Sequence, residues 1–349
     1  MIRIPFRLAA SLLAGALAVA PAMAQTPTPD SSDGSDRITI TGIQPERMRD
    51  FVRELMEPGK LGQLSRWEDE VCPGVVGLTP EASQAMLDRI ALRAVSLDLR
   101  VGEPGCKANV LVVVTDDGQQ FTPTFVQQNK KLFGDAFDSG NTLGKTALDR
   151  FTKADKPVRW WHVSQTVTDR GKVLGDSTAT AAGGGGFSGA QVARVNNASR
   201  LGASTHQEFN RIIAIVDTSK TKGVSFSAVA DYIAMIALTQ VQADVDAAGY
   251  DSILNVFDGP IGGDEPMTGW TAWDSAFVNG LYAVRKDFVS SQQLENEIVR
   301  QVTEANAEEE GGEEMKAADK LRYYLRNKVL KIWRNVDENT GQVHPGFVT

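Results

Sequence analysis

Hydrophobic positions along the chain alternate between helix-like and strand-like patterns. Apolar residues recur at helical spacing from Met86 to Leu97, behind Thr79 and Pro80, which suit a helix start. The segments 109–115, 158–167 and 211–217 are β-branched and apolar, as is typical of buried strands. The segment 226–241 is apolar on nearly every side, which predicts a core helix. The pattern indicates an α/β or α+β fold: a small mixed sheet with packed helices.

Helical spacing also predicts helices over 45–56 and 124–133. In the C-terminal half it predicts the helices 270–288, 291–310 and 317–333, so this half is expected to be helical. The last is apolar on one side and basic on the other, so it is also a candidate for docking onto a partner or an anionic membrane surface.

The N-terminus has the pattern of a cleavable bacterial signal peptide. Arg3 and Arg7 precede an uncharged apolar run over 8–20, and Ala22-Met23-Ala24 supplies small residues for cleavage. The run is shorter than the ~20 residues of a membrane-spanning helix, and no later segment reaches that length. The sequence therefore predicts a periplasmic or extracellular protein, cleaved near Ala24.

Composition divides the rest of the chain. The predicted parts are a signal peptide (1–24), a flexible leader rich in Pro, Thr, Ser, Asp and Gly (25–36), a single globular domain (37–335) and a C-terminal tail (336–349). Within the domain, residues 170–204 are predicted to form a flexible Gly-rich loop.

Net charge argues against nucleic acid as a partner. The whole chain has a formal charge of −8, and removal of Arg3 and Arg7 with the signal peptide makes it −10. No run of Lys and Arg is long enough to suggest contact with a phosphate backbone.

Cys72 and Cys106 are the only cysteines, and in an exported protein an even pair predicts a disulfide. A reactive thiol or a metal site is the alternative. Neither cysteine has another Cys or a His nearby at ligand-like spacing, which favours the disulfide.

Candidates for catalysis are few, because the chain has three histidines, His162, His206 and His344, far apart in sequence. We predict no metal site and no cofactor. His206 has the H-x-E spacing of a deaminase, but the P-C-x-x-C half is missing. A hydrolase would need His162 or His206 with a serine and an aspartate. That hypothesis predicts that two of His162, His206, Asp217 and Asp231 meet in one cleft.

The tryptophans are candidates for a binding surface. Trp160 and Trp161 are adjacent on a predicted strand, so their side chains point to opposite faces and one of them could be exposed. Trp270 belongs to a predicted helix, where it packs in the core or offers a platform for a peptide or glycan.

Several local patterns carry a family resemblance. Cys72-Pro73, Gly77-Leu78, Gly105-Cys106 with Asn109, and the helix containing 230–234 together resemble exported proteins of α-proteobacteria that have no known activity. The order of strand 211–217 and the following helix is also similar to the zincin metalloprotease core. That likeness implies Ala230 and Ala234 at the zinc-ligand positions and Asp231 at the general-base position, so zinc could not be bound there.

These observations favour a non-catalytic binding or scaffold domain that is exported and takes a protein, peptide or glycan as its partner. The alternative is a hydrolase with a peptidase-like fold and no zinc-binding motif, for which His162, His206 and Asp231 are the candidate catalytic residues.

Overall fold

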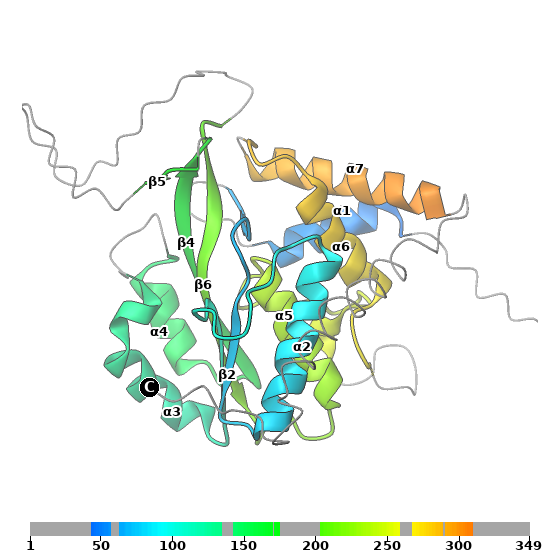
Figure 1. Cartoon of the computed structure of the whole chain (residues 1–349). Helices are drawn as coiled ribbons and strands as arrows, with labels where there is room; N and C mark the ends of the chain where they lie inside the picture. The colour runs from blue at the N-terminus through cyan, green and yellow to red at the C-terminus, as the bar shows by residue number, and fades with distance from the viewer. Residues whose placement is uncertain are drawn as a thin grey trace, which may run out of the picture. The chain divides into compact units, whose positions relative to one another are not determined.

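The computed structural model describes residues 43–56, 63–134, 142–169, 171–174, 203–258, 267–288 and 290–309 (Figure 1). All of them belong to one compact unit, Gly42–Thr349. The signal peptide, the leader, most of the Gly-rich loop, helix 317–333 and the tail lie outside these residues. The features assigned to them stay predictions from the sequence.

A mixed sheet runs through the described part of the chain, and its central strand is β6 (Thr205–Asp217). The second half of β6 pairs in parallel with β3 (Val110–Thr115), and the first half pairs in parallel with β1 (Ser65–Arg66). On its other side β6 pairs antiparallel with β4 (Val158–Thr168). The edge strands are β2 (Pro73–Val76), parallel to β3, and β5 (Val173–Leu174), antiparallel to β4.

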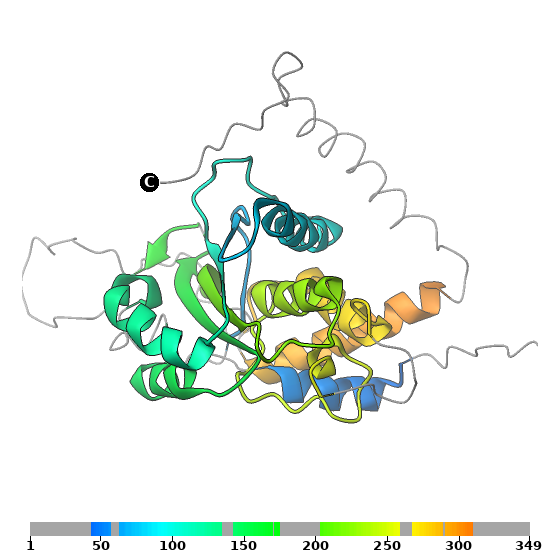
Figure 2. The same ribbon diagram turned by 90° about the horizontal axis from the view of Figure 1, so that it is seen from below.

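Helices cover both faces of this sheet, as Figure 2 shows from below. One face carries α3 (Gly118–Gln128), α4 (Lys145–Lys153) and the short helix η1 (Lys130–Phe133). The other carries a larger group: α1 (Pro45–Leu55), α2 (Pro80–Ser96), α5 (Phe226–Leu238), η2 (Ile253–Asn255), α6 (Ala272–Ala283) and α7 (Ser291–Glu309). Among these helices, none has the length and apolar composition needed to cross a membrane.

The hydrophobic core follows the period of two along each strand. In β6, Ile212 and Ala214 pack toward the larger helical group, whereas Ile213 and Ile215 pack toward α3 and α4. Every position in this part of the strand is therefore buried, which explains its continuous apolar run. The predicted class, a mixed sheet with packed helices and a helical C-terminal half, is confirmed.

Several elements differ from prediction; for example, α6 spans Ala272–Ala283 rather than 270–288, so Trp270 precedes the helix. Helix 124–133 was placed too late, because Asp117 caps α3 by accepting from the Gln120 N–H at 2.9 Å, and the helix continues through Pro123. Strand β6 begins at Thr205, six residues before the predicted strand, since its polar first half pairs with β1 and β4. The predicted Gly-rich loop contains a short paired strand, β5.

Cys72 and Cys106 form a disulfide, as predicted, with Cα atoms 6.0 Å apart. It joins the segment before β2 to the segment before β3. Asn109 reinforces this link, because its side chain accepts from the Cys72 N–H at 2.7 Å and donates to the Glu70 carbonyl at 2.8 Å.

Candidate functional site

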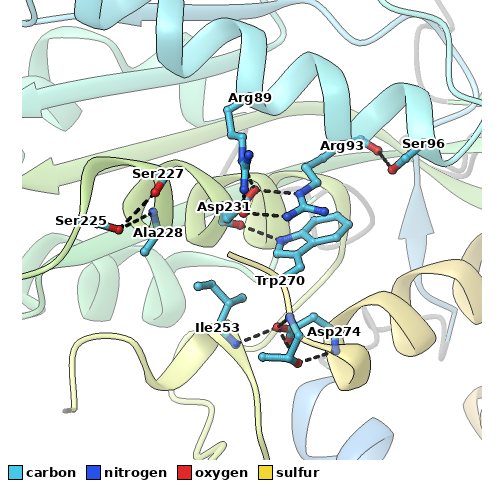
Figure 3. Close-up of polar contacts among 11 residues, drawn as sticks. Arg89, Arg93, Ser96, Ser225, Ser227, Ala228, Asp231, Ile253, Trp270 and Asp274 are labelled. Atoms are coloured by element: carbon cyan, nitrogen blue, oxygen red, sulfur yellow. Dashed lines mark hydrogen bonds and ion pairs between the residues drawn. The ribbon is translucent and has the colours of Figure 1, made fainter. Parts of the chain in front are cut away.

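Asp231 on α5 lies against two arginines of α2, in the cluster drawn in Figure 3. Arg89 and Arg93 are four residues apart, so both side chains leave the same side of α2. Arg89 donates through Nε and Nη2 to the two carboxylate oxygens at 2.8 and 2.5 Å, and Arg93 does so at 2.8 and 2.7 Å. One carboxylate therefore holds two guanidinium groups by bidentate contacts.

The surroundings of Asp231 settle its protonation state. Its side chain is fully buried, and burial alone would raise the pKa of this carboxyl. The hydrogen bonds and charges of Arg93 and Arg89 outweigh burial, so the pKa lies below its usual range and the group is ionised. Because each oxygen already accepts two N–H groups, Asp231 is not available as a general base. It positions the two arginines.

Trp270 and Gly269 complete the cluster. The Trp270 indole donates from Nε1 to the main-chain oxygen of Asp231 at 2.8 Å, and Cζ of Arg93 lies 4.4 Å from the centre of the indole ring. A Cβ atom on Gly269 would come within 2.5 Å of the Asp231 carboxylate and 2.9 Å of Arg89. Glycine is thus the residue that lets the backbone pass directly over the ion cluster.

The segment that carries Trp270 is anchored by Asp274. This buried carboxylate accepts from Ser252 Oγ at 2.6 Å, the Ile253 N–H at 2.8 Å and the Thr271 N–H at 2.9 Å. Burial raises the pKa of Asp274. Thr271 also caps α6. Asp274 therefore ties Ser252 and Ile253 to the start of α6, and Trp270 stands directly before that helix (Figure 3).

His162 belongs to the core. It lies on β4, is 5% exposed, and its Nε2–H donates to the Ile236 carbonyl at 2.8 Å. Burial lowers its pKa to about 4, so the imidazole is uncharged at neutral pH. Its ring packs against Phe209. These contacts hold the ring in the core and occupy its Nε2.

His206 lies near the start of β6, away from Asp231. Its Nε2 contacts Glu208 Oε1 at 2.8 Å. Burial favours the protonated form of Glu208, but the hydrogen bond and charge of His206, with help from Gln165 and Lys286, lower the pKa of this carboxyl overall. Glu208 is therefore an ionised carboxylate hydrogen-bonded to the His206 ring.

Two of His162, His206, Asp217 and Asp231 were expected to meet for hydrolysis, and no two of them are hydrogen-bonded to each other. Asp217 accepts from the Gly118 N–H at 3.0 Å and from Ser219, whereas Asp231, His162 and His206 each have other partners. The prediction of a shared cleft is wrong, because each side chain meets its hydrogen-bonding needs within a different part of the fold. Within the described residues, no group of three or more His, Cys, Asp or Glu side chains is arranged to hold a metal ion.

Ala230 and Ala234, the positions that a zincin would use for ligands, are fully buried and line no open cleft. They pack within the core of the larger helical group.

The tryptophans divide into two kinds. Trp160 and Trp161 point to opposite faces as predicted, but both are buried, with Nε1 donating to the Val241 and Phe133 carbonyls at 3.1 and 2.9 Å. The expectation that one is exposed is wrong, because helices cover both faces of the sheet there. Trp270 remains partly exposed.

Arg89 and Arg93 were not among the residues predicted from the sequence. A signal was present, because Asp231 interrupts an otherwise apolar helix, and a buried carboxylate requires a cationic or hydrogen-bonding partner. Two arginines spaced by four on an amphipathic helix are suitable partners. Nothing in the sequence placed α2 beside α5.

No protein-family model, curated protein or solved structure matches the chain. The resemblance to exported α-proteobacterial proteins and to the zincin core stays a prediction.

Proposed function

We propose that the chain is an exported, non-catalytic binding domain, and that Arg89, Arg93 and Trp270 hold an acidic segment of a peptide partner. One observation carries the proposal: Asp231 is saturated by hydrogen bonds, while the arginines that it positions reach the surface. The cluster is thus arranged for recognition rather than for proton transfer.

Charge and geometry support an anionic partner. Two guanidinium groups face one carboxylate, which leaves one positive charge. The contacts with Asp231 use two of the five N–H donors of each guanidinium. The side chains of Arg89 and Arg93 are 35% and 24% exposed, so part of each is open to a ligand. Because Asp231 fixes the two guanidinium groups before a ligand binds, they suit the planar carboxylates of Glu and Asp side chains.

A titration tests this recognition. We expect hexaglutamate to bind the purified protein in a calorimeter and hexaglutamine not to bind, with affinity falling as salt is added. Arg93→Lys keeps the charge but loses the bidentate geometry, so it weakens binding about tenfold. Arg150→Lys, on exposed α4, is the matched control and leaves binding unchanged. Equal binding of the two peptides, or a stronger preference for an acidic glycan, contradicts the proposal.

Export has separate support. The disulfide is of the kind that persists in oxidising compartments, and the first 24 residues have the pattern of a signal peptide. We propose a periplasmic or extracellular location. Expression of the whole chain in a bacterium, followed by fractionation and N-terminal sequencing, tests it. The proposal requires a non-cytoplasmic product that starts near Gln25, and a full-length cytoplasmic product contradicts it.

The absence of catalysis is testable with peptide and glycan libraries. We expect no turnover by the pure protein. Turnover that disappears when His162 or His206 is replaced would establish the hydrolase alternative instead.

A further inference from the structure

A second site lies at the amino end of β6, where the segment around β1 meets the end of α6 and the start of α7. A pocket there has a cavity volume of about 30 Å³. That is room for about two water-sized groups. Its apolar lining comes from Leu64, Leu281, Phe288 and Leu294. The pocket thus suits the end group of a ligand with an apolar part beside it.

The ionisable side chains that line this pocket are all basic or imidazole: Arg66, His206, Arg285 and Lys286. Arg66 is buried, donates to the carbonyls of Leu281 and Val284, both at 2.8 Å, and pairs with Glu68 through Nε at 3.2 Å. Arg285 and Lys286 have side chains that are 77% and 53% exposed and pair with Asp287 and Glu68. The Arg285–Asp287 pair is exposed and separates at little cost. Lys286 shares Glu68, whose side chain is 19% exposed, with Arg66, so these three groups together leave one positive charge for an incoming anion.

The side chain of Gln63 indicates that a ligand in this pocket should carry a hydrogen-bond donor. Its amide nitrogen donates to the carbonyls of Thr205 and Phe288 at 2.9 and 3.0 Å. Because both partners are acceptors, the orientation of the amide is fixed. Its Oε1 is then buried without a hydrogen-bond partner, and Gln63 lines the pocket. An orphaned buried acceptor is costly, and a ligand N–H would satisfy it.

We infer that this pocket binds a carboxylate that carries an adjacent N–H donor and an apolar side chain. The C-terminal residue of a peptide and an N-acyl amino acid share this chemistry. The carboxylate lies among the cations, the N–H meets Gln63 Oε1, and the side chain packs on Leu281, Phe288 and Leu294. The site is separate from the cluster of Arg89 and Arg93, because the two lie at opposite ends of α6, about 18 Å long.

Titration of four small ligands into the ¹⁵N-labelled protein tests separately the contributions of the carboxylate, the N–H and the apolar side chain. We expect N-acetyl-leucine to give saturable shifts in residues around the pocket. N-acetyl-leucinamide lacks the charge, 4-methylpentanoic acid lacks the N–H, and N-acetylglycine lacks the apolar side chain, so each binds at least fivefold more weakly. A tripeptide ending in leucine that binds more tightly than N-acetyl-leucine identifies a peptide terminus as the natural source, and equal or weaker binding identifies a free N-acyl amino acid.

Variants locate the site. The double substitution Arg285→Gln and Lys286→Gln lies on the surface and should weaken the binding of N-acetyl-leucine at least fivefold. Lys172→Gln, an exposed change between β4 and β5, should leave the affinity for N-acetyl-leucine unchanged. Arg93→Lys also leaves it unchanged, which keeps this test independent of the proposed acidic-peptide site. Equal binding of the acid and the amide, shifts that map elsewhere, or no saturation up to about 10 mM would overturn the inference.

Discussion

The guanidinium of Arg93 lies over the ring of Trp270, with Cζ 4.4 Å from the ring centre, while the same guanidinium binds the Asp231 carboxylate. Arg93 thus links three segments: α2, α5 and the residues directly before α6. Its position is fixed from two sides, by an anion and by an aromatic ring. This relationship ties the stability of the cluster to the proposed recognition surface.

Replacement of Asp231 should destabilise the protein strongly. In Asp231→Asn, two arginines lose their anion beside a buried amide, and we expect the free energy of unfolding to fall by about 3 kcal/mol. Urea denaturation measures it. Asp88→Asn, an exposed change on α2 beside Arg89, is the matched control. A loss of less than about 1 kcal/mol for Asp231→Asn would mean that the cluster behaves as an ordinary surface ion pair.

Gly269 should tolerate no side chain. In Gly269→Ala the new methyl group meets Asp231 and Arg89 at the close distances given above, so the backbone must move away from the cluster. We expect lower stability by about 1 to 3 kcal/mol and weaker binding of hexaglutamate. Thr268→Ala, one residue earlier and exposed, is the control. Wild-type stability and binding in Gly269→Ala would show that the Gly269 backbone does not cover the cluster.

His162 should make stability depend on pH. Its folded pKa of about 4 lies below the ordinary value of 6.5, so below pH 6.5 the unfolded chain binds a proton that the folded protein does not. The free energy of unfolding therefore falls as pH drops from about 7 to 4, by about 3 kcal/mol from this group. In His162→Gln this dependence is reduced, as urea denaturation at several pH values would show. An unchanged pH profile would contradict the burial of an uncharged imidazole.

The disulfide should contribute measurably to stability. Replacement of Cys72 and Cys106 by alanine frees a loop with a sequence separation of 34, and we expect a loss of about 3 to 4 kcal/mol. Thermal unfolding of this variant should match that of the reduced wild-type protein. A difference between those two would show that the alanines disturb packing beyond the loss of the bond.

The sequence predicted the parts of the fold that depend on local pattern. Strands β3 and β6 were found because their residues are buried on both sides, and α2 because Thr79 and Pro80 mark its start. Prediction failed where structure depends on distant contacts. The polar first half of β6 is a strand because β1 and β4 pair with it, and no local pattern indicates that.

The candidate site was predictable only in part. Asp231 and Trp270 were singled out separately, and the structure brings them together with Arg89 and Arg93. The ion pairs join residues more than 130 positions apart, and the spacing of residues within one helix or strand does not indicate such contacts. Trp160 and Trp161 were misjudged for a related reason, because the helices α3, α4 and α5 that bury them come from other parts of the chain.

The indole N–H signal of Trp270, assigned with Trp270→Phe, tests the central claim most directly. In ¹⁵N spectra of the purified protein, we predict that hexaglutamate shifts this signal saturably, that hexaglutamine does not, and that Arg93→Lys weakens the response about tenfold. A Trp270 signal that stays in place while hexaglutamate binds elsewhere, or that responds equally to both peptides, would contradict the account.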